Sequence, residues 1–235
     1  MRIYFLLLAL MCLCSTLAIA QTSNQRTGWL FLMNNNKLTK KWGTHLDVQL
    51  RTGDQFSHLR NFMFRPGLTY FINDKSDLTL GYLLNQTYIP QAGMSDIQLN
   101  EHRIWQQYIY KHKINVLNFS HRFRLEQRFI DQQKGEDLFA QRLRYFVRAI
   151  LPLAKGQQKF EKGAFVALQN ELMFNIQHKG NVNGHFFDQN RAYVAAGYRF
   201  SKQFDLEAGY LNQAQKMRSG QTINHAIQLA VYTRF

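Results

Sequence analysis

The feature that most constrains the fold is an alternation of apolar and polar residues that recurs along most of the chain. Between 117 and 129 every even-numbered residue is polar or charged, and the odd-numbered ones are mostly Leu or Phe. The stretches 44–51, 142–149 and 226–235 alternate in a similar way. Successive side chains of a β-strand point to opposite faces, so a period of two predicts strands and excludes helices. The chain is therefore expected to be all-β.

The alternating stretches predict eleven strands, several of them much longer than the usual strand of about five or six residues. They span 28–34, 42–51, 57–71, 77–86, 98–111, 115–130, 138–151, 163–175, 187–200, 204–213 and 222–235. Short connections alternate with longer polar ones along most of the chain, and 152–162 departs from that order. Alternating short turns and long loops are typical of outer-membrane barrels.

The first twenty residues have the pattern of a secretory signal peptide. A positive start at Arg2 is followed by an apolar run, and Ala18 and Ala20 are the small residues that a signal peptidase reads. We therefore expect a signal peptide over 1–20, with a retained membrane anchor as the alternative. Both cysteines of the chain lie in this segment, so the mature chain has no thiol for a disulfide or a metal site.

The charge of the chain needs an explanation that suits an exported protein. Lys and Arg number 29 against 15 Asp and Glu, which gives a net charge of +14. Excess positive charge often marks a protein that binds nucleic acid. An exported protein rarely meets nucleic acid, so no nucleic-acid partner is expected and the arginines need another role.

Period two does not reveal which face of a barrel points inward. A soluble lipocalin-like barrel hides its apolar face, whereas a transmembrane barrel shows that face to lipid and keeps polar residues inside. The membrane version is favoured by strand length, because a tilted strand crosses a bilayer in about 9–11 residues. Aromatic residues at the short-turn ends, such as Tyr70, Tyr108 and Tyr198, also favour it as an interfacial girdle.

We therefore expect a transmembrane up-and-down antiparallel β-barrel in the bacterial outer membrane, formed by residues 21–235 and surrounded by outer-membrane lipid. Single-chain bacterial barrels normally have an even number of strands. The sequence thus predicts about 12 strands, one of them not recognised in the pattern. A barrel of 10 strands is the alternative if 28–34 does not pair fully.

Two resemblances support this interpretation. The ending IQLAVYTRF resembles the terminal strand of bacterial outer-membrane barrels, which implies that Phe235 is an insertion signal read by the barrel-assembly machinery. Stretches over most of the mature chain, at 101–107, 122–129, 142–145, 170–172 and 187–191, resemble a family of Gram-negative outer-membrane proteins known only as a domain of unknown function. That resemblance implies a barrel and a location, but no activity and no catalytic residues.

Folding the expected hairpins about their turns brings charged residues of the polar faces together. The expected pairs are Glu101–Arg124, Arg103–Arg122, Arg124–Arg144, Glu126–Arg142, Arg144–Glu171 and Glu171–Arg191. The first two pairs assume a turn centred near His112. Glu101, Glu126 and Glu171 are thus the predicted salt-bridge partners of a charged belt in the lumen.

The arginines of this belt outnumber its carboxylates. The candidates for lining the lumen and binding anions are Arg103, Arg122, Arg124, Arg128, Arg142, Arg144, Arg148 and Arg191. Spare arginine in a narrow wet pore attracts anions. The leading interpretation is a narrow porin-like channel, or a binding site, for small anionic solutes. The alternative is a closed structural or surface-interaction barrel whose lumen is plugged by Glu and Arg.

An enzyme is not expected. Nucleophilic catalysis needs a Ser and a His on one face, but Ser120 and His121 are adjacent and so point to opposite faces of a strand. His121 is expected instead in the aromatic girdle or at a subunit contact. His178, His185 and Asp188 are too loosely spaced to predict a metal site, so no metal and no cofactor are expected. A lipid-modifying outer-membrane enzyme is the third alternative.

Overall fold

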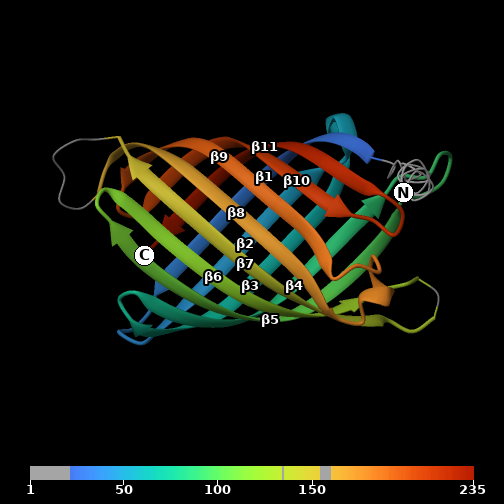
Figure 1. Ribbon diagram of the computed structural model, residues 1–235, viewed down its shortest axis with the longest axis horizontal. Coiled ribbons are helices and arrows are strands. Elements are labelled where there is room, and N and C mark those ends of the chain that lie inside the picture. The colour runs from blue at the N-terminus through green and yellow to red at the C-terminus, as the bar shows by residue number, and fades with distance from the viewer. Residues whose placement is uncertain (1–21, 134, 154–159) are drawn as a thin grey trace, which may run out of the picture.

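The computed structural model describes residues 22–133, 135–153 and 160–235, and within them eleven strands close into one barrel (Figure 1). The strands are β1 (Thr22–Lys37), β2 (Trp42–Thr52), β3 (Leu59–Asn73), β4 (Ser76–Ile89), β5 (Ile97–Ile114), β6 (Leu117–Ile130), β7 (Leu138–Pro152), β8 (Gly163–Gln177), β9 (Phe187–Ser201), β10 (Phe204–Lys216) and β11 (Gln221–Arg234). Two short 3-10 helices, η1 (Asp54–Phe56) and η2 (Lys179–Asn181), lie in connections. No helix among these residues is long and apolar enough to cross a membrane. The expected signal peptide, 1–20, lies outside the described residues.

The barrel closes through a parallel pair of strands. All consecutive strands pair antiparallel, whereas β1 pairs with β11 in parallel, from Thr22 opposite Gln221 to Asn35 opposite Arg234. An odd number of strands that alternate in direction leaves the first and the last pointing the same way, so these two can pair only in parallel. The all-β, closed up-and-down barrel is confirmed. The described residues form eleven strands, one fewer than the predicted 12 and one more than the alternative of 10, and 28–34 lies within a full-length β1.

The two ends of the barrel differ in the length of their connections (Figure 1). Tight turns join β1 to β2, β3 to β4, β5 to β6 and β9 to β10 at one end, here called the short-turn end. β7 ends at Pro152 and β8 begins at Gly163 at this end too. The other connections, with η1 and η2, lie at the opposite, long-loop end. β1 begins at the long-loop end, and β11 finishes at the short-turn end.

The last residue, Phe235, is tied to the first strand. Its backbone N–H donates to the carbonyl of Asn35 at 3.0 Å, and its own carbonyl accepts from the N–H of Lys37 at 2.6 Å. The side chain of Phe235 is exposed. The role of Phe235 as a membrane-insertion signal stays a prediction.

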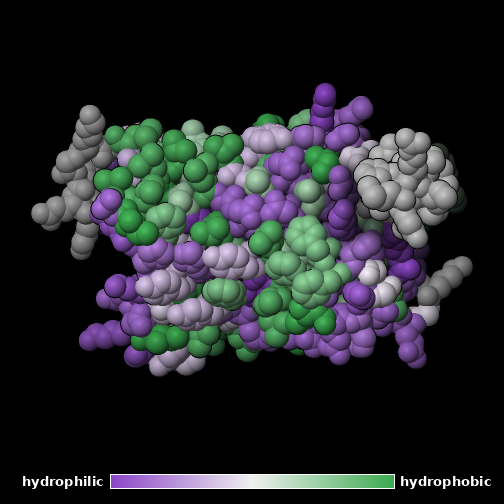
Figure 2. Space-filling model, in the orientation of Figure 1, coloured by the Kyte–Doolittle hydropathy of each residue, from purple (hydrophilic) through white to green (hydrophobic). Residues whose placement is uncertain are grey.

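The outward faces of the strands carry large apolar side chains. Exposed examples from around the barrel are Leu30, Leu68, Leu80, Ile104, Phe123, Leu168, Val194 and Ile227. Exposed aromatic residues near the short turns are Trp42, Tyr70, Tyr108, Tyr110, Tyr198 and Phe200. Figure 2 shows hydrophobic patches on the visible face, broken by a polar strip. Outward polar side chains also form hydrogen bonds with each other. The side-chain N–H of Asn190, for example, donates to the side-chain oxygen of Asn170 at 2.9 Å.

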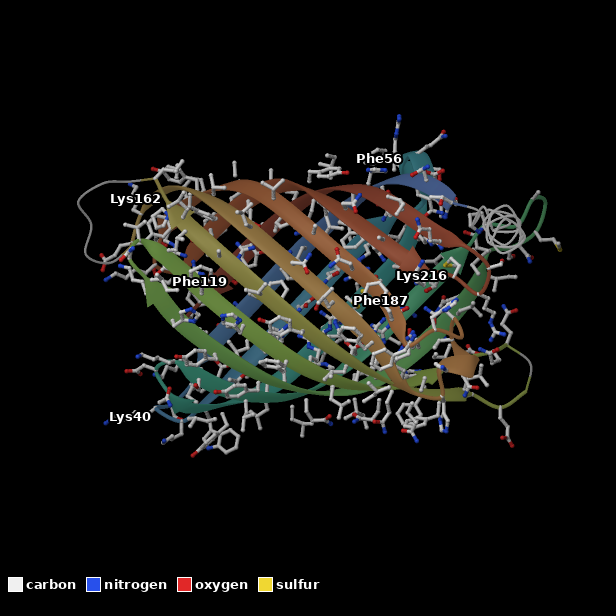
Figure 3. The ribbon with its side chains drawn as sticks, in the orientation of Figure 1. Lys40, Phe56, Phe119, Lys162, Phe187 and Lys216 are labelled. Carbon is white, nitrogen blue, oxygen red and sulfur yellow. The ribbon has the colours of Figure 1, made fainter. Side chains whose placement is uncertain are left out.

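The inward faces carry most of the buried polar and charged residues, and side chains extend into the interior along its length (Figure 3). Trp105 on β5 is completely buried and lies across β4 and β3, where Gly81 and Gly67 have no side chain. Its ring meets that of His45 on β2, with 5.6 Å between the centroids. A Cβ at Gly81 would lie 2.1 Å from the indole, so glycine is required at this point of the crossing.

The β5–β6 hairpin turns later than predicted. β5 continues to Ile114, and the turn falls at 115–116, where Asn115 has a positive φ of 51°. The observed pairs are Gln107–Arg124, Arg103–Arg128 and Glu101–Ile130, in place of the expected Glu101–Arg124 and Arg103–Arg122. The expected turn near His112 is wrong because 111–113 continue the ladder of hydrogen-bonded strands, and Asn115 readily adopts the left-handed backbone that a tight turn needs.

Candidate functional site

Glu126 on β6 is a carboxylate of the lumen whose side chain has no exposed surface. It accepts hydrogen bonds from Arg142 at 2.7 Å and from Arg144 at 2.6 Å, both on β7, and lies 3.4 Å from Arg103 on β5. A buried carboxylate without partners loses its hydration at high cost. The three arginines therefore allow this charge to stay in the interior.

Three further carboxylates extend the ion-pair network along the wall from β5 to β9. Their ion pairs are Arg103–Glu101 (2.6 Å), Arg128–Glu101 (2.6 Å), Arg122–Glu171 (2.6 Å), Arg144–Glu171 (2.7 Å), Arg191–Glu171 (3.8 Å) and Arg142–Asp188 (2.8 Å). Arg122 and Arg142 each reach past a neighbouring strand to their partners. The carboxylate cluster is defined here as Glu101, Glu126, Glu171 and Asp188 with Arg103, Arg122, Arg128, Arg142 and Arg144.

The register of this wall agrees with the sequence prediction in part. Pairs found as expected are Arg124–Arg144, Glu126–Arg142 and Glu171–Arg191. Arg144 lies opposite Met173 instead of Glu171, because the unbroken run of pairs from Arg142–Asn175 to Pro152–Phe165 is centred one residue later in the chain than expected. The long Arg144 side chain nevertheless reaches Glu171, so a shift of two residues does not break the ion pair.

A second group of arginines gathers at Trp29 of β1. The guanidinium carbon of Arg51 on β2 is 3.7 Å from the centroid of the Trp29 ring, and that of Arg191 on β9 is 5.2 Å from it. Arg51 donates to the side-chain oxygen of Gln49, and no carboxylate in the described part of the chain forms an ion pair with it. Arg191 has one ion pair, with Glu171 at 3.8 Å, and the Nε atoms of both arginines are buried without a hydrogen-bond partner. Trp29, Arg51 and Arg191 are called the Trp29 cluster.

Arg124 also lacks an ion pair with any described carboxylate. It donates twice to the side-chain oxygen of Gln107, at 3.1 and 2.6 Å, and its guanidinium lies over Trp105 at 4.5 Å. Its side chain is almost completely buried. Arg124 is therefore held by an amide and an indole.

The lumen contains three cavities in series. The mouth cavity, of about 620 Å³, lies at the long-loop end beside Arg218 and Ser219. The central cavity, of about 290 Å³, shares Arg128 and Arg142 with it. The short-turn cavity, of about 530 Å³, extends to Phe235. The interior of the barrel is thus hollow at three levels between the two ends.

The central and the short-turn cavities differ in charge. The described residues that line the central cavity include no Asp or Glu, and their arginines are Arg51, Arg60, Arg65, Arg103, Arg128, Arg142, Arg144 and Arg191. The short-turn cavity has arginines too, but its lining also includes Asp47, Asp77, Glu171 and Asp205. Among the described residues, the charged side chains that line the central cavity are therefore all positive, and six of them are paired with carboxylates outside that lining.

The sequence identified most, but not all, of these arginines. Seven of the eight predicted candidates line a cavity: Arg103, Arg122, Arg128, Arg142, Arg144, Arg148 and Arg191. Arg124 lines none of the three cavities. The sequence analysis did not include Arg51, Arg60 and Arg65 among the lumen candidates. Arg51 belongs to the polar face of the alternating stretch 44–51, so the pattern did offer it. The missing information was barrel closure, which brings β2 and β3 to the same cavity as β9.

The residues considered for catalysis lie apart. Ser120 lines the short-turn cavity, whereas the ring nitrogen Nδ1 of His121 lies 2.9 Å from the Tyr145 hydroxyl within an outward aromatic stack. His45 Nδ1 is 2.7 Å from the side-chain oxygen of Asn35. Among the described residues, no group of three or more His, Cys, Asp and Glu side chains could hold a metal ion. The expectation that the chain is not an enzyme stays a prediction.

Comparison with known proteins gives one family match. A family model described as a protein of unknown function, DUF2490, matches residues 26–224, from within β1 into β11. An uncharacterized protein of Methylorubrum extorquens is 31% identical over 235 residues, which cover 98% of this chain and 97% of that protein. Among solved structures, LpxR from Salmonella typhimurium aligns over 87% of this chain and 88% of its own, with 12% identity and a TM-score of 0.49.

Proposed function

The chain belongs to the family of proteins of unknown function DUF2490, and we propose that it is an outer-membrane β-barrel that takes small anionic solutes into its lumen. The resemblance to such a family is thereby confirmed. The observation that carries the proposal is the central cavity, whose described lining has eight arginines and no carboxylate. A concave wall of one sign concentrates counter-ions and attracts charged solutes.

The outer surface supports the location in a membrane. Strands of 11 to 18 residues reach or exceed the length of about 9–11 residues that a tilted strand needs to cross a bilayer. Leu30, Leu80 and Ile227 are large apolar side chains that stay exposed on the outward face. Burying such surface in lipid is favourable at roughly 25 cal/mol per Å². The exposed aromatic residues at the short-turn end suit the interface between lipid and water.

The proposal is tested by electrical recording from the folded protein in a planar bilayer under a salt gradient. A steady current whose reversal potential shows anion preference is the expected result if solutes pass through. Binding of anions in solution without current would limit the function to binding. A folded barrel that neither conducts nor binds any anion would contradict the proposal. Fractionation of cell envelopes tests the location, because the protein should sediment with the outer membrane.

A plugged structural barrel is the second candidate, and the ion pairs that reach past neighbouring strands favour it. Arg148 on β7 pairs with Glu207 on β10, and Arg142 on β7 pairs with Asp188 on β9. Such pairs tie distant parts of the wall together inside the lumen. In this case the barrel would give no current, and its long loops would be the place to look for partners.

A lipid-modifying enzyme is the third candidate, and it is tested separately. Purified barrel is incubated with outer-membrane lipid, and the lipid is then separated by thin-layer chromatography. A new lipid species that forms in proportion to the protein would establish enzyme activity. Unchanged lipid together with anion binding would support the leading proposal.

A further inference from the structure

Five side chains line both the central and the short-turn cavity: Trp29, Arg51, Arg65, Arg144 and Arg191. They therefore form the wall between the two cavities. Any solute that moves from one cavity to the other has to pass them. Trp29 is only 5% exposed, so the wall is built around a buried aromatic ring.

The four arginines of this wall differ in what neutralises them. Arg65 and Arg144 are each held by carboxylates. Arg51 forms no ion pair with a described carboxylate, and Arg191 has Glu171 at 3.8 Å. Glu171 is also bound, at shorter distances, by two other arginines. Close to two positive charges thus remain beside Trp29 without matching negative charge.

The geometry at Trp29 leaves these charges available to a ligand. A cation–π contact uses the face of a guanidinium and leaves its N–H edge free. The Nε donors of Arg51 and Arg191 are buried and have no acceptor. A buried donor without an acceptor lacks a group that would complete it. Arg65, Arg122 and Arg124 have such a donor too, but Arg51 and Arg191 combine it with contact to one ring and with little compensating charge. An oxyanion fits, because it takes two parallel N–H bonds from one guanidinium edge.

We propose that Arg51 and Arg191 together bind one small, doubly charged oxyanion beside Trp29: phosphate, or the phosphate group of a phosphate monoester. This site rests on the proposed function and narrows it to one class of solute. A doubly charged ligand matches the two arginines, whereas a carboxylate would neutralise one of them. The central cavity, of about 290 Å³ and lined also by Gln189 and Gln213, leaves room for the organic part of a monoester.

The test is isothermal titration of the full folded barrel in detergent micelles with inorganic phosphate, glycerol phosphate and acetate. Phosphate, glycerol phosphate or both should bind more tightly than acetate. Arg51→Gln and Arg191→Gln should each weaken binding at least about tenfold, because each removes charge-assisted hydrogen bonds. Arg199→Gln is the matched control: Arg199 lines the short-turn cavity and already binds Asp205 through two bonds of 2.8 and 2.9 Å. This variant should bind as the unmodified protein does.

Each outcome separates the site from the broader function. Tighter binding of glycerol phosphate identifies a monoester as the ligand, and equal binding identifies free phosphate. Phosphate binding that is unchanged in both Gln variants would overturn the site while leaving anion binding by the lumen intact. Acetate binding as tight as that of phosphate would overturn the doubly charged class. No anion binding and no current would remove the proposed function as well.

Folding of each variant is checked by its heat-dependent gel mobility. Arg51→Lys covers the case in which a Gln variant fails to fold. It keeps the charge but loses the planar fork, and should bind phosphate more weakly than the unmodified protein does. Unchanged binding by this variant would contradict the role given to the guanidinium of Arg51.

Discussion

The carboxylate cluster and the Trp29 cluster hold arginines inside the same barrel by different means. In the carboxylate cluster, the single side chain of Glu126 contacts three guanidinium groups. In the Trp29 cluster an indole lies against Arg51 and Arg191, and the nearest ion pair is the 3.8 Å contact of Arg191 with Glu171. Carboxylates neutralise arginine, whereas an aromatic ring positions it and leaves its charge in place. The first arrangement stabilises the wall, and the second keeps charge for a ligand.

The largest expected effect comes from the carboxylate cluster. Glu126→Gln removes the negative charge that compensates Arg103, Arg142 and Arg144, and leaves buried positive charges facing each other. Breaking a buried ion pair by removing one partner costs about 3–5 kcal/mol. The free energy of unfolding, measured with guanidinium chloride in detergent micelles, should fall by that amount.

The matched control for this variant is Glu161→Gln. Glu161 lies 2.8 Å from Lys202, and both side chains are largely exposed to solvent. Exposed ion pairs contribute about 0–1 kcal/mol, so this variant should unfold close to the unmodified protein. If the free energy of unfolding fell equally in the two variants, the buried ion pairs of Glu126 would be no more stabilising than an exposed ion pair.

An intermediate effect is expected where an indole crosses the wall. Gly81→Ala places a methyl group against the ring of Trp105, which also lies under Arg124. Overpacking of a filled interior costs about 1–3 kcal/mol. Gly180→Ala is the control, since a Cβ there meets nothing within 4 Å. If both variants unfold at the same denaturant concentration, Trp105 does not depend on the glycines beneath it.

The smallest effect is expected for Arg124→Gln, two residues from Glu126 on the same face of β6. Arg124 has no ion pair with a described carboxylate, and a glutamine can still bond to the amide of Gln107. Loss of the charge also removes repulsion from nearby arginines such as Arg144 across the ladder. The free energy of unfolding should change by less than about 1 kcal/mol. A loss as large as that of Glu126→Gln would show that an arginine held by an amide and an indole stabilises the barrel as much as the buried carboxylate does.

The strands could be predicted from the sequence because alternation is a local property. The pairing of β6 with β7 followed as well, and it set Arg124 opposite Arg144. The β5–β6 turn could not be placed, because the charged residues 111–113 look like a turn and yet continue the ladder past the expected position. Two alternating strands keep their pattern when they slide by an even number of residues, so alternation alone does not set their register.

The Trp29 cluster could not be predicted from alternation and hairpin pairing, for a different reason. Arg191 on β9 meets Trp29 on β1 across β10 and β11, and small side chains such as Ala226 line part of that path. Their meeting depends on how the barrel closes. The rule of even strand numbers predicted an antiparallel closure, which would have changed the neighbours of β1. Hairpin reasoning finds contacts between adjacent strands, and this cluster joins strands that the sequence does not show to be close.

Because β1 and β11 run side by side in the same direction, Thr22 at the start of β1 and Phe235 after β11 lie at opposite ends of the barrel. A peptide joined ahead of Thr22 would emerge at the long-loop end, and one joined after Phe235 at the short-turn end. In a barrel with an even number of strands both peptides would emerge on the same side. Two different reporters fused to one copy of this chain would therefore lie at the two opposite ends of the barrel. Neither reporter would have to be inserted into a loop.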